Sequence, residues 1–113
     1  MFDKDMYVKI IDFGISEDLS QSQRFLRDGG TLGYMAPEVL LKCKYSYQAD
    51  FFAVGIIMYR LIMGKMPFQN RHDKTLLRRE IFANQIEIDY KTLNPDKFTK
   101  TSVDFTNRLL QTN

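Results

Sequence analysis

The run from Gln48 to Met63, QADFFAVGIIMYRLIM, constrains the fold more than any other stretch. After Asp50, only Gly55 and Arg60 are not apolar, so no helical face carries a polar stripe. A helix that is hydrophobic on all sides either crosses a membrane or forms the centre of a core. At about 1.5 Å per residue the run covers roughly 24 Å, less than the ~30 Å of bilayer hydrocarbon, and lipid disfavours its two charges. We therefore expect a central helix over 48–63 that is buried in a protein core.

Composition bounds the class of protein. The chain has 113 residues, enough for one domain or part of one, with 44% hydrophobic and 27% charged residues. Its net charge of +2 does not require nucleic acid or an anionic membrane as a partner. The single cysteine, Cys43, excludes an intrachain disulfide, and the N-terminus lacks the apolar run of a signal peptide. We expect an intracellular, cytoplasmic setting.

Three further elements follow from the pattern of apolar residues. Residues 1–11 are expected to form a short β-hairpin, since two runs that favour strands flank a polar turn. Helices are expected over 73–85 and 101–111. The expected N-terminal caps are Ser46 for the central helix, Asp73 and Thr101 for the later two, with Gly64 ending the central helix.

Five short motifs follow one another in a meaningful order. The triplet Asp12-Phe13-Gly14 alone is a weak signal, but GTLGYMAPE follows at 30–38. Together they resemble the D-F-G to A-P-E stretch of a protein kinase. The chain continues in the same register with DFFAVG at 50–55, GKMPF at 64–68 and DFTNRLL at 104–110. The residues of these motifs are most similar to those of the AGC-like serine/threonine kinases.

This resemblance implies a fold. Residues 1–113 would be a partial protein kinase domain from the C-terminal lobe, mainly α with a short N-terminal hairpin, within an α+β domain. Residues 12–38 would be the activation segment. The sequence contains no glycine-rich loop, no strand lysine with its glutamate partner, and no H-R-D catalytic loop. We therefore expect a fragment that is inactive alone, whose first and last residues need not be true termini, and which needs the rest of the kinase domain.

The D-F-G triplet carries the implied metal site. Asp12 would bind the Mg²⁺ that bridges the phosphates of ATP, because magnesium prefers hard oxygen ligands. Its alternative role is a solvated carboxylate in a turn. Phe13 would pack in the core, and Gly14 would let the backbone turn.

The end of the activation segment carries the implied substrate site. Thr31 matches the threonine that lies beside the catalytic base, and a threonine there resembles serine/threonine specificity; its alternative role is a turn hydroxyl. Gly33 and Tyr34 would join it in binding substrate. Pro37 and Glu38 would close the segment, Glu38 by pairing with an arginine in a later helix of the lobe.

Two positions in the central helix have implied structural roles. Asp50 would accept backbone N–H bonds from the catalytic loop, or would simply favour the start of a helix. Gly55 resembles the glycine of the family's D-x-W-S-x-G motif, in which Phe52 and Ala53 stand in place of tryptophan and serine. The sequence departs from the family at Arg27, which occupies the position where related kinases often carry a phosphorylated threonine. Possible phosphorylation sites are Ser16, Ser20 and Ser22.

The implied function is that of a fragment. Its full-length parent would use ATP and magnesium to phosphorylate serine or threonine in a protein substrate. The alternatives are a non-catalytic remnant or pseudokinase that acts as a binding or scaffold module, and a truncated gene model. A basic patch at the helix expected over 73–85 would either bind a partner in a scaffold role or form a solvated face. Its residues are Arg71, Lys74, Arg78 and Arg79.

Overall fold

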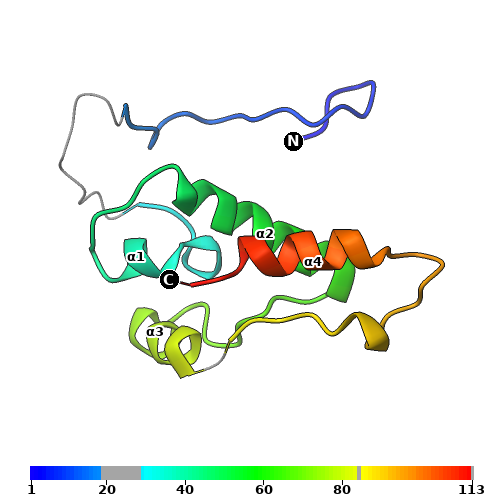
Figure 1. Ribbon diagram of the computed structural model, residues 1–113. Helices are drawn as coiled ribbons and strands as arrows, with labels where there is room; N and C mark the ends of the chain where they lie inside the picture. The colour runs from blue at the N-terminus through cyan, green and yellow to red at the C-terminus, as the bar shows by residue number, and fades with distance from the viewer. Residues whose placement is uncertain (19–28, 84, 113) are drawn as a thin grey trace.

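The computed structural model describes residues 1–18, 29–83 and 85–112. Its elements are, in chain order, the 3-10 helix η1 (Leu32–Tyr34), α1 (Pro37–Leu40), α2 (Gln48–Met63), α3 (Lys74–Ala83), the 3-10 helix η2 (Tyr90–Thr92) and α4 (Lys100–Leu109). The helix α2 contacts α4 and η1, and α3 contacts α1 and η1 (Figure 1). The described residues are therefore mainly helical, and no strand is assigned among them.

The helix α2 covers the same residues that the apolar run predicted, 48–63. Gly64 ends it in the left-handed conformation, with φ of 69°, and donates its N–H to the carbonyl of Arg60 at 2.9 Å. The start differs by one residue, because Tyr47 and not Ser46 is the N-cap. The Ser46 hydroxyl still accepts the Gln48 N–H at 3.3 Å. Both ends of α2 thus satisfy backbone groups that a helix leaves unpaired.

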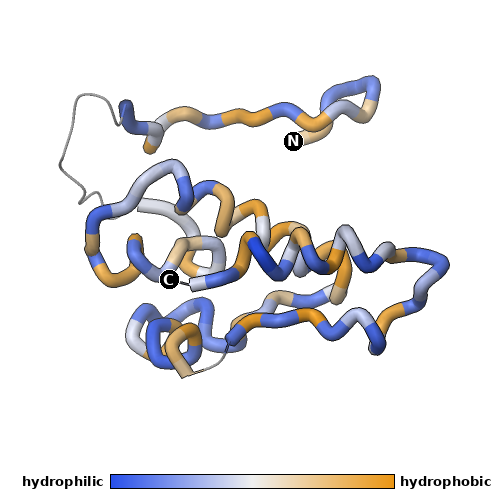
Figure 2. Tube along the Cα trace, in the orientation of Figure 1, coloured by the Kyte–Doolittle hydropathy of each residue, from blue (hydrophilic) through white to orange (hydrophobic). Residues whose placement is uncertain are grey.

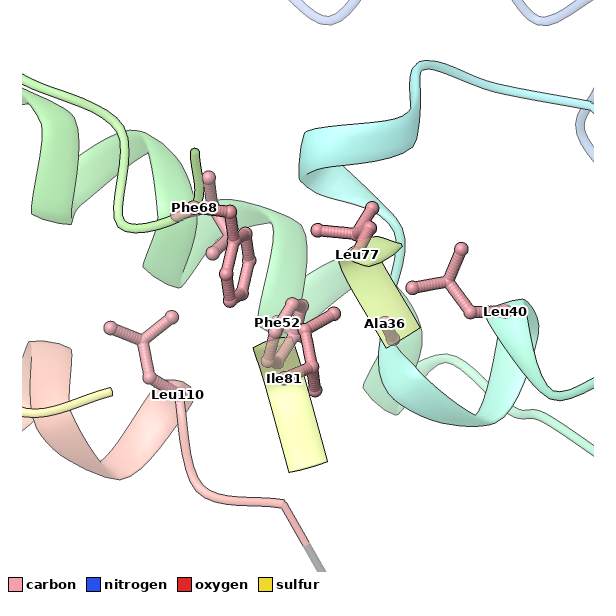
Figure 3. Packing of buried hydrophobic residues seen from close by; sticks show 8 residues of the cluster. Ala36, Leu40, Phe52, Phe68, Leu77, Ile81 and Leu110 are labelled. Atoms are coloured by element: carbon pink, nitrogen blue, oxygen red, sulfur yellow. The ribbon is translucent and has the colours of Figure 1, made fainter. Parts of the chain in front are cut away.

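A cluster of buried apolar side chains joins the helices. Most of its side chains converge from different elements in Figure 3, where α2, α3 and the segment leading into α1 meet. Burial of such side chains contributes about 1.5–3 kcal/mol each before chain entropy is counted. The buried members are Ala36, Leu40, Phe52, Ile56, Phe68, Leu77, Ile81 and Leu110.

The helices α2 and α4 approach closely at Gly55. A Cβ atom at this position would lie 2.9 Å from the Leu109 Cβ and 3.0 Å from the Leu110 Cδ2. Real Cβ atoms almost never come so near, so a side chain here would push the helices apart. The absence of a side chain at Gly55 therefore sets the distance between α2 and α4.

The expectation that α2 is buried on all sides was wrong. Only Phe52, Gly55 and Ile56 are buried along it. A stripe of apolar side chains faces solvent instead, spaced three or four residues apart and so lying on one side of the helix. We call this the outer stripe; its residues are Phe51, Val54, Ile57 and Leu61. The described part of the chain contains no element that covers it.

The ends of the later helices also differ from expectation. The helix α3 is described over Lys74–Ala83, residue 84 lies outside the described residues, and Gln85, which was expected to be helical, is not. Asp73 caps α3 as expected by accepting the Thr75 and Leu76 N–H groups at 2.8 and 3.0 Å. The helix α4 covers 100–109 and not 101–111. Its cap is Thr99, whose side chain accepts the Ser102 N–H at 3.2 Å. Thr99 has the extended backbone that a cap requires, with φ of −87° and ψ of 151°, whereas Thr101 lies inside the helix.

One side-chain amide fastens the segment before η2 to α4. The Asn107 Oδ1 accepts the Ile88 N–H at 2.8 Å, and the Asn107 Nδ2 donates to the Ile88 carbonyl at 3.0 Å. The amide thereby satisfies both backbone groups of a buried residue, as a neighbouring strand would. The sequence analysis did not identify this contact.

The hairpin expected over 1–11 is not formed as two strands. The structure has one isolated antiparallel bridge, between Phe2 and Val8, around a turn in which Met6 has φ of 65°. Apart from the half-buried Asp3, all residues from 1 to 18 are exposed. A two-stranded hairpin without a surface to pack on is marginal in water, which accounts for the short pairing. In Figures 1 and 2 this segment, which contains several strongly hydrophobic residues, runs apart from the helices.

Glu80 on α3 organises the turn that precedes this helix. Its carboxylate accepts the backbone N–H groups of Gln69 at 2.9 Å and Asn70 at 3.0 Å, and the Asn70 side-chain amide at 3.2 Å. Desolvation by partial burial raises the pKa of Glu80, but these three hydrogen bonds outweigh it and lower the pKa below its usual value. The ionised form is therefore the one that stabilises the fold.

We expect Glu80→Gln to lower the free energy of unfolding by about 1 kcal/mol near neutral pH, because a neutral amide offers fewer and weaker acceptors. A lowered pKa in the folded state gives stability that is complete above the ordinary glutamate pKa and is lost as pH falls through the folded value. The difference between the two proteins should thus shrink on acidification. Urea unfolding at several pH values measures it. Glu87→Gln, at an exposed glutamate, is the control; an equal loss there would contradict the role of Glu80.

No helix within residues 1–18, 29–83 and 85–112 has both the length and the apolarity needed to cross a bilayer.

Candidate functional site

The Asp12-Phe13-Gly14 triplet forms a tight turn. Asp12 has a left-handed backbone, with φ of 65°, and its Oδ1 accepts the Gly14 N–H at 3.1 Å. Ser16 closes the turn by donating its hydroxyl to the Phe13 carbonyl at 2.7 Å. Aspartate tolerates this conformation because its own side chain bonds the backbone two residues on. The turn leaves the Asp12 carboxylate exposed to solvent.

The expectation that Phe13 packs in the core was wrong for the described residues, because its side chain is 68% exposed. Its neighbours Ile11 and Ile15 are exposed as well. No described element lies over this segment (Figure 1). A hydrogen bond links it to the loop between α1 and α2, from the Tyr45 hydroxyl to the Glu17 Oε2 at 3.2 Å.

The described second half of the expected activation segment, residues 29–38, packs on the helices. Gly33 lies buried in η1, and a Cβ there would come within 3.1 Å of the Met66 Cε and 3.3 Å of the Arg71 Cβ. Tyr34 is half-buried, and its hydroxyl accepts a hydrogen bond from the Arg60 Nη1 at 2.9 Å. Thr31 directly precedes η1 and is exposed. The segment thus presents a threonine to solvent from a fixed backbone.

Arg60 is a residue that the sequence analysis did not assign to the site. It is one of only two charged residues in the apolar run that forms α2, and that isolation was the available signal. Its contact with Tyr34 joins η1 to the last turn of α2. Charge-assisted hydrogen bonds of this kind are stronger than neutral ones.

Pro37 and Glu38 begin α1. Pro37 is buried at the first helical position, where a missing N–H costs nothing. Glu38 lies in the first turn, its side chain is half-buried, and its carbonyl accepts the Cys43 N–H at 2.9 Å. The arginine expected to pair with Glu38 is not among its contacts in the described residues.

Asp50 lies in the first turn of α2 and is exposed. It occupies the same side of the helix as Val54, Ile57 and Leu61 of the outer stripe, at intervals of three or four residues. The backbone N–H donors expected for it are not present among the described residues. Gly55, the other structural position, lies on the buried side against α4.

The structure therefore brings some of the expected residues together and leaves others apart. Thr31, Gly33, Tyr34 and Pro37 form one unit against α2 and α3. Asp12 lies on the separate N-terminal segment (Figure 1). Of the possible phosphorylation sites, Ser16 is exposed within the D-F-G turn, whereas Ser20 and Ser22 lie outside the described residues.

The metal site can be tested against these side chains. No group of three or more histidine, cysteine, aspartate or glutamate side chains in the described ranges could hold an ion. Magnesium in phosphoryl-transfer sites uses one or two carboxylates and takes its other ligands from water and phosphates. Asp12, an exposed carboxylate, has the donor chemistry of one of those ligands. The other ligands of such a site would come from elsewhere.

Comparison with known families agrees with the order of the motifs. The family model described as protein kinase domain matches residues 1–113, the whole chain. The chain belongs to the protein kinase family.

The individual relatives are kinases too. The chain is 33% identical over 115 residues to human rhodopsin kinase GRK1, covering 98% of the chain and 19% of that protein. It is 35% identical over 107 residues to CDPK-related kinase 4 of Arabidopsis thaliana, covering 95% of the chain and 17% of that protein. It is 31% identical over 113 residues to mouse cGMP-dependent protein kinase 2, covering all of the chain and 14% of that protein. The chain is therefore AGC-like and spans less than a fifth of these relatives.

Proposed function

We propose that these residues form the activation-segment part of the C-terminal lobe in a serine/threonine protein kinase, and that the complete domain phosphorylates a protein substrate. The proposal is carried by the presence of two features in one chain. One is the turn that exposes Asp12, and the other is the Thr31–Glu38 segment, which is packed on the helices. Phosphoryl transfer depends on positioning and charge stabilisation, and these two parts would supply one magnesium ligand and one substrate platform.

Asp12 would hold Mg²⁺, which neutralises charge on the phosphates of ATP when it is bound. Its left-handed turn holds the carboxylate to Gly14 and leaves it accessible. Thr31, Gly33 and Tyr34 would receive the peptide substrate. Gly33 is buried beneath this platform, and the bond from Arg60 keeps Tyr34 in place. Ser16, exposed beside the Asp12 turn, is a candidate for phosphorylation.

The rest of a kinase domain is the proposed partner of the exposed apolar surfaces. The outer stripe of α2 and the apolar residues of 1–15 would be covered by it, since exposed surfaces of this kind mark interaction sites. Packing would then extend the single bridge at Phe2 and Val8 into the expected hairpin. Asp50, on the side of the outer stripe, would receive N–H bonds from the catalytic loop. We also propose a cytoplasmic setting, which the free, exposed Cys43 favours.

We expect the 113-residue chain alone to transfer no phosphate, because it contains no H-R-D loop, glycine-rich loop or strand lysine. The measurement incubates the purified chain with magnesium, radiolabelled ATP and a mixture of serine- and threonine-containing peptides. The Asp12→Ala variant defines the background. Turnover by the unaltered chain that exceeds this background would contradict the proposal that the machinery is shared with other residues.

A further inference from the structure

A groove lies between the end of α1 and the outer side of α3. It encloses about 350 Å³, within the range of sites that take a small ligand or a few side chains. Leu41 and Phe82 supply apolar walls, and the Phe82 side chain is 58% exposed. We call it the α3 groove; its lining residues are Leu41, Thr75, Arg78, Arg79 and Phe82.

The rim of the α3 groove is positively charged. Arg78 and Arg79 are both exposed and line it directly. Lys74 lies one turn earlier on the same helix, four residues before Arg78. The acidic groups closest in sequence are engaged elsewhere, since Asp73 caps α3 and Glu80 binds the turn at 69–70. The arginines are thus not neutralised by these two carboxylates.

The α3 groove differs from an ordinary solvated charged face because it combines apolar lining residues with arginines. A solvated charged face needs neither a hollow nor an exposed phenylalanine, whereas both are present here. Guanidinium groups bind carboxylates through two parallel hydrogen bonds. The net charge of only +2 and the apolar walls fit a protein ligand better than a nucleic-acid strand. In Figure 1, α3 and the N-terminal segment lie on different sides of α2, so covering that segment would leave the groove open.

We propose that the α3 groove binds an acidic segment of another protein, in which a large apolar side chain is flanked by carboxylates. The apolar side chain would lie between Leu41 and Phe82, and the carboxylates would pair with Arg78 and Arg79. This role needs no phosphoryl transfer. It therefore stands or fails independently of the function proposed above.

The test uses the full chain and a fluorescein-labelled synthetic peptide with a central Phe-Leu pair flanked by glutamates. Fluorescence anisotropy measures the dissociation constant. We expect the double variant R78Q/R79Q to weaken binding at least about tenfold and Phe82→Ala about fivefold, because one removes the ion pairs and the other an apolar wall. The matched control K91Q/K97Q removes the same charge from exposed positions outside the groove and should change binding by less than about twofold.

Two further peptides separate the contributions of charge and apolar contact. Replacing the glutamates by glutamines, or the Phe-Leu pair by serines, should each weaken binding to the unaltered chain. The five positions substituted in the protein variants are exposed in the native fold, and circular dichroism of each variant checks that the helices are retained. Equal binding by R78Q/R79Q and the control, or tighter arginine-dependent binding of polyuridylate than of the peptide, would overturn the proposal.

Discussion

Replacing Ile56 by alanine is expected to lower the free energy of unfolding by about 2–5 kcal/mol, the usual cost of emptying a packed core position. Ile56 is 0% exposed and lies in the middle of α2, within the one cluster that joins this helix to its neighbours. Domains of ordinary stability have only about 5–15 kcal/mol in total, so this loss is a large fraction. Urea unfolding followed by far-ultraviolet circular dichroism measures it.

The next residue supplies the matched control. Ile57 has the same side chain in the same helix but is 48% exposed, on the outer stripe. We expect Ile57→Ala to cost less than about 1 kcal/mol, because much less apolar surface leaves a packed environment. If Ile56→Ala is unfolded from the start, Ile56→Val gives a graded result of about 0.5–1.5 kcal/mol. Equal losses at positions 56 and 57 would contradict the placement of the core.

The sequence predicted α2 well because its signals are local. These signals are an apolar run, a glycine just after its end and a polar residue before its first turn, and each depends on few neighbours. Gly64 therefore ends the helix as expected, while the cap differs by one residue. The prediction of the α4 cap from local signals was wrong. Thr99 and Thr101 are both residues of a type that caps helices, and only the backbone conformation distinguishes them.

Burial was harder to predict than secondary structure. The composition of α2 is apolar on every side, but composition does not say which protein surface covers each side. The outer stripe and Phe13 are exposed in the described residues because nothing in those residues reaches them. The prediction of a hairpin over 1–11 also depended on a surface that the described residues do not provide. The two runs favour strands, but no sheet or core lies beneath them, and they form an isolated bridge.

In the candidate site, too, local features could be predicted from the sequence and long-range contacts could not. The motifs predicted roles for Asp12, Thr31, Tyr34 and Gly55 from residue type and spacing, and these roles stay predictions. They could not identify Arg60, whose contact with Tyr34 spans 26 positions, or the Asn107 amide that holds Ile88 from 19 positions away. Such long-range hydrogen bonds leave no periodic signal in a sequence. The only hint of Arg60 was its charge within an apolar run that has just one other charged residue, Asp50.

The largest expected effect on activity comes from Asp12. We expect a chimera that places the glycine-rich loop through the catalytic loop of cGMP-dependent protein kinase 2 ahead of this chain to phosphorylate a serine-containing peptide. The donor segment would supply the glycine-rich loop, the strand lysine and the catalytic loop that this sequence lacks, and Asp12 would supply the magnesium ligand. Asp12→Ala should then lower the rate at least about a hundredfold, the usual cost of removing a group that stabilises charge in the transition state.

The most direct measurement is therefore the rate of phosphate transfer by the chimera, its Asp12→Ala variant and an Asp5→Ala control. Asp5 is also an exposed carboxylate of the N-terminal segment, but it lies in the turn before the D-F-G triplet. We predict full activity in the chimera and the control, with activity lost only in the Asp12 variant. A chimera that unfolds cooperatively, and so is folded, yet transfers phosphate no faster than its Asp12→Ala variant would contradict the account.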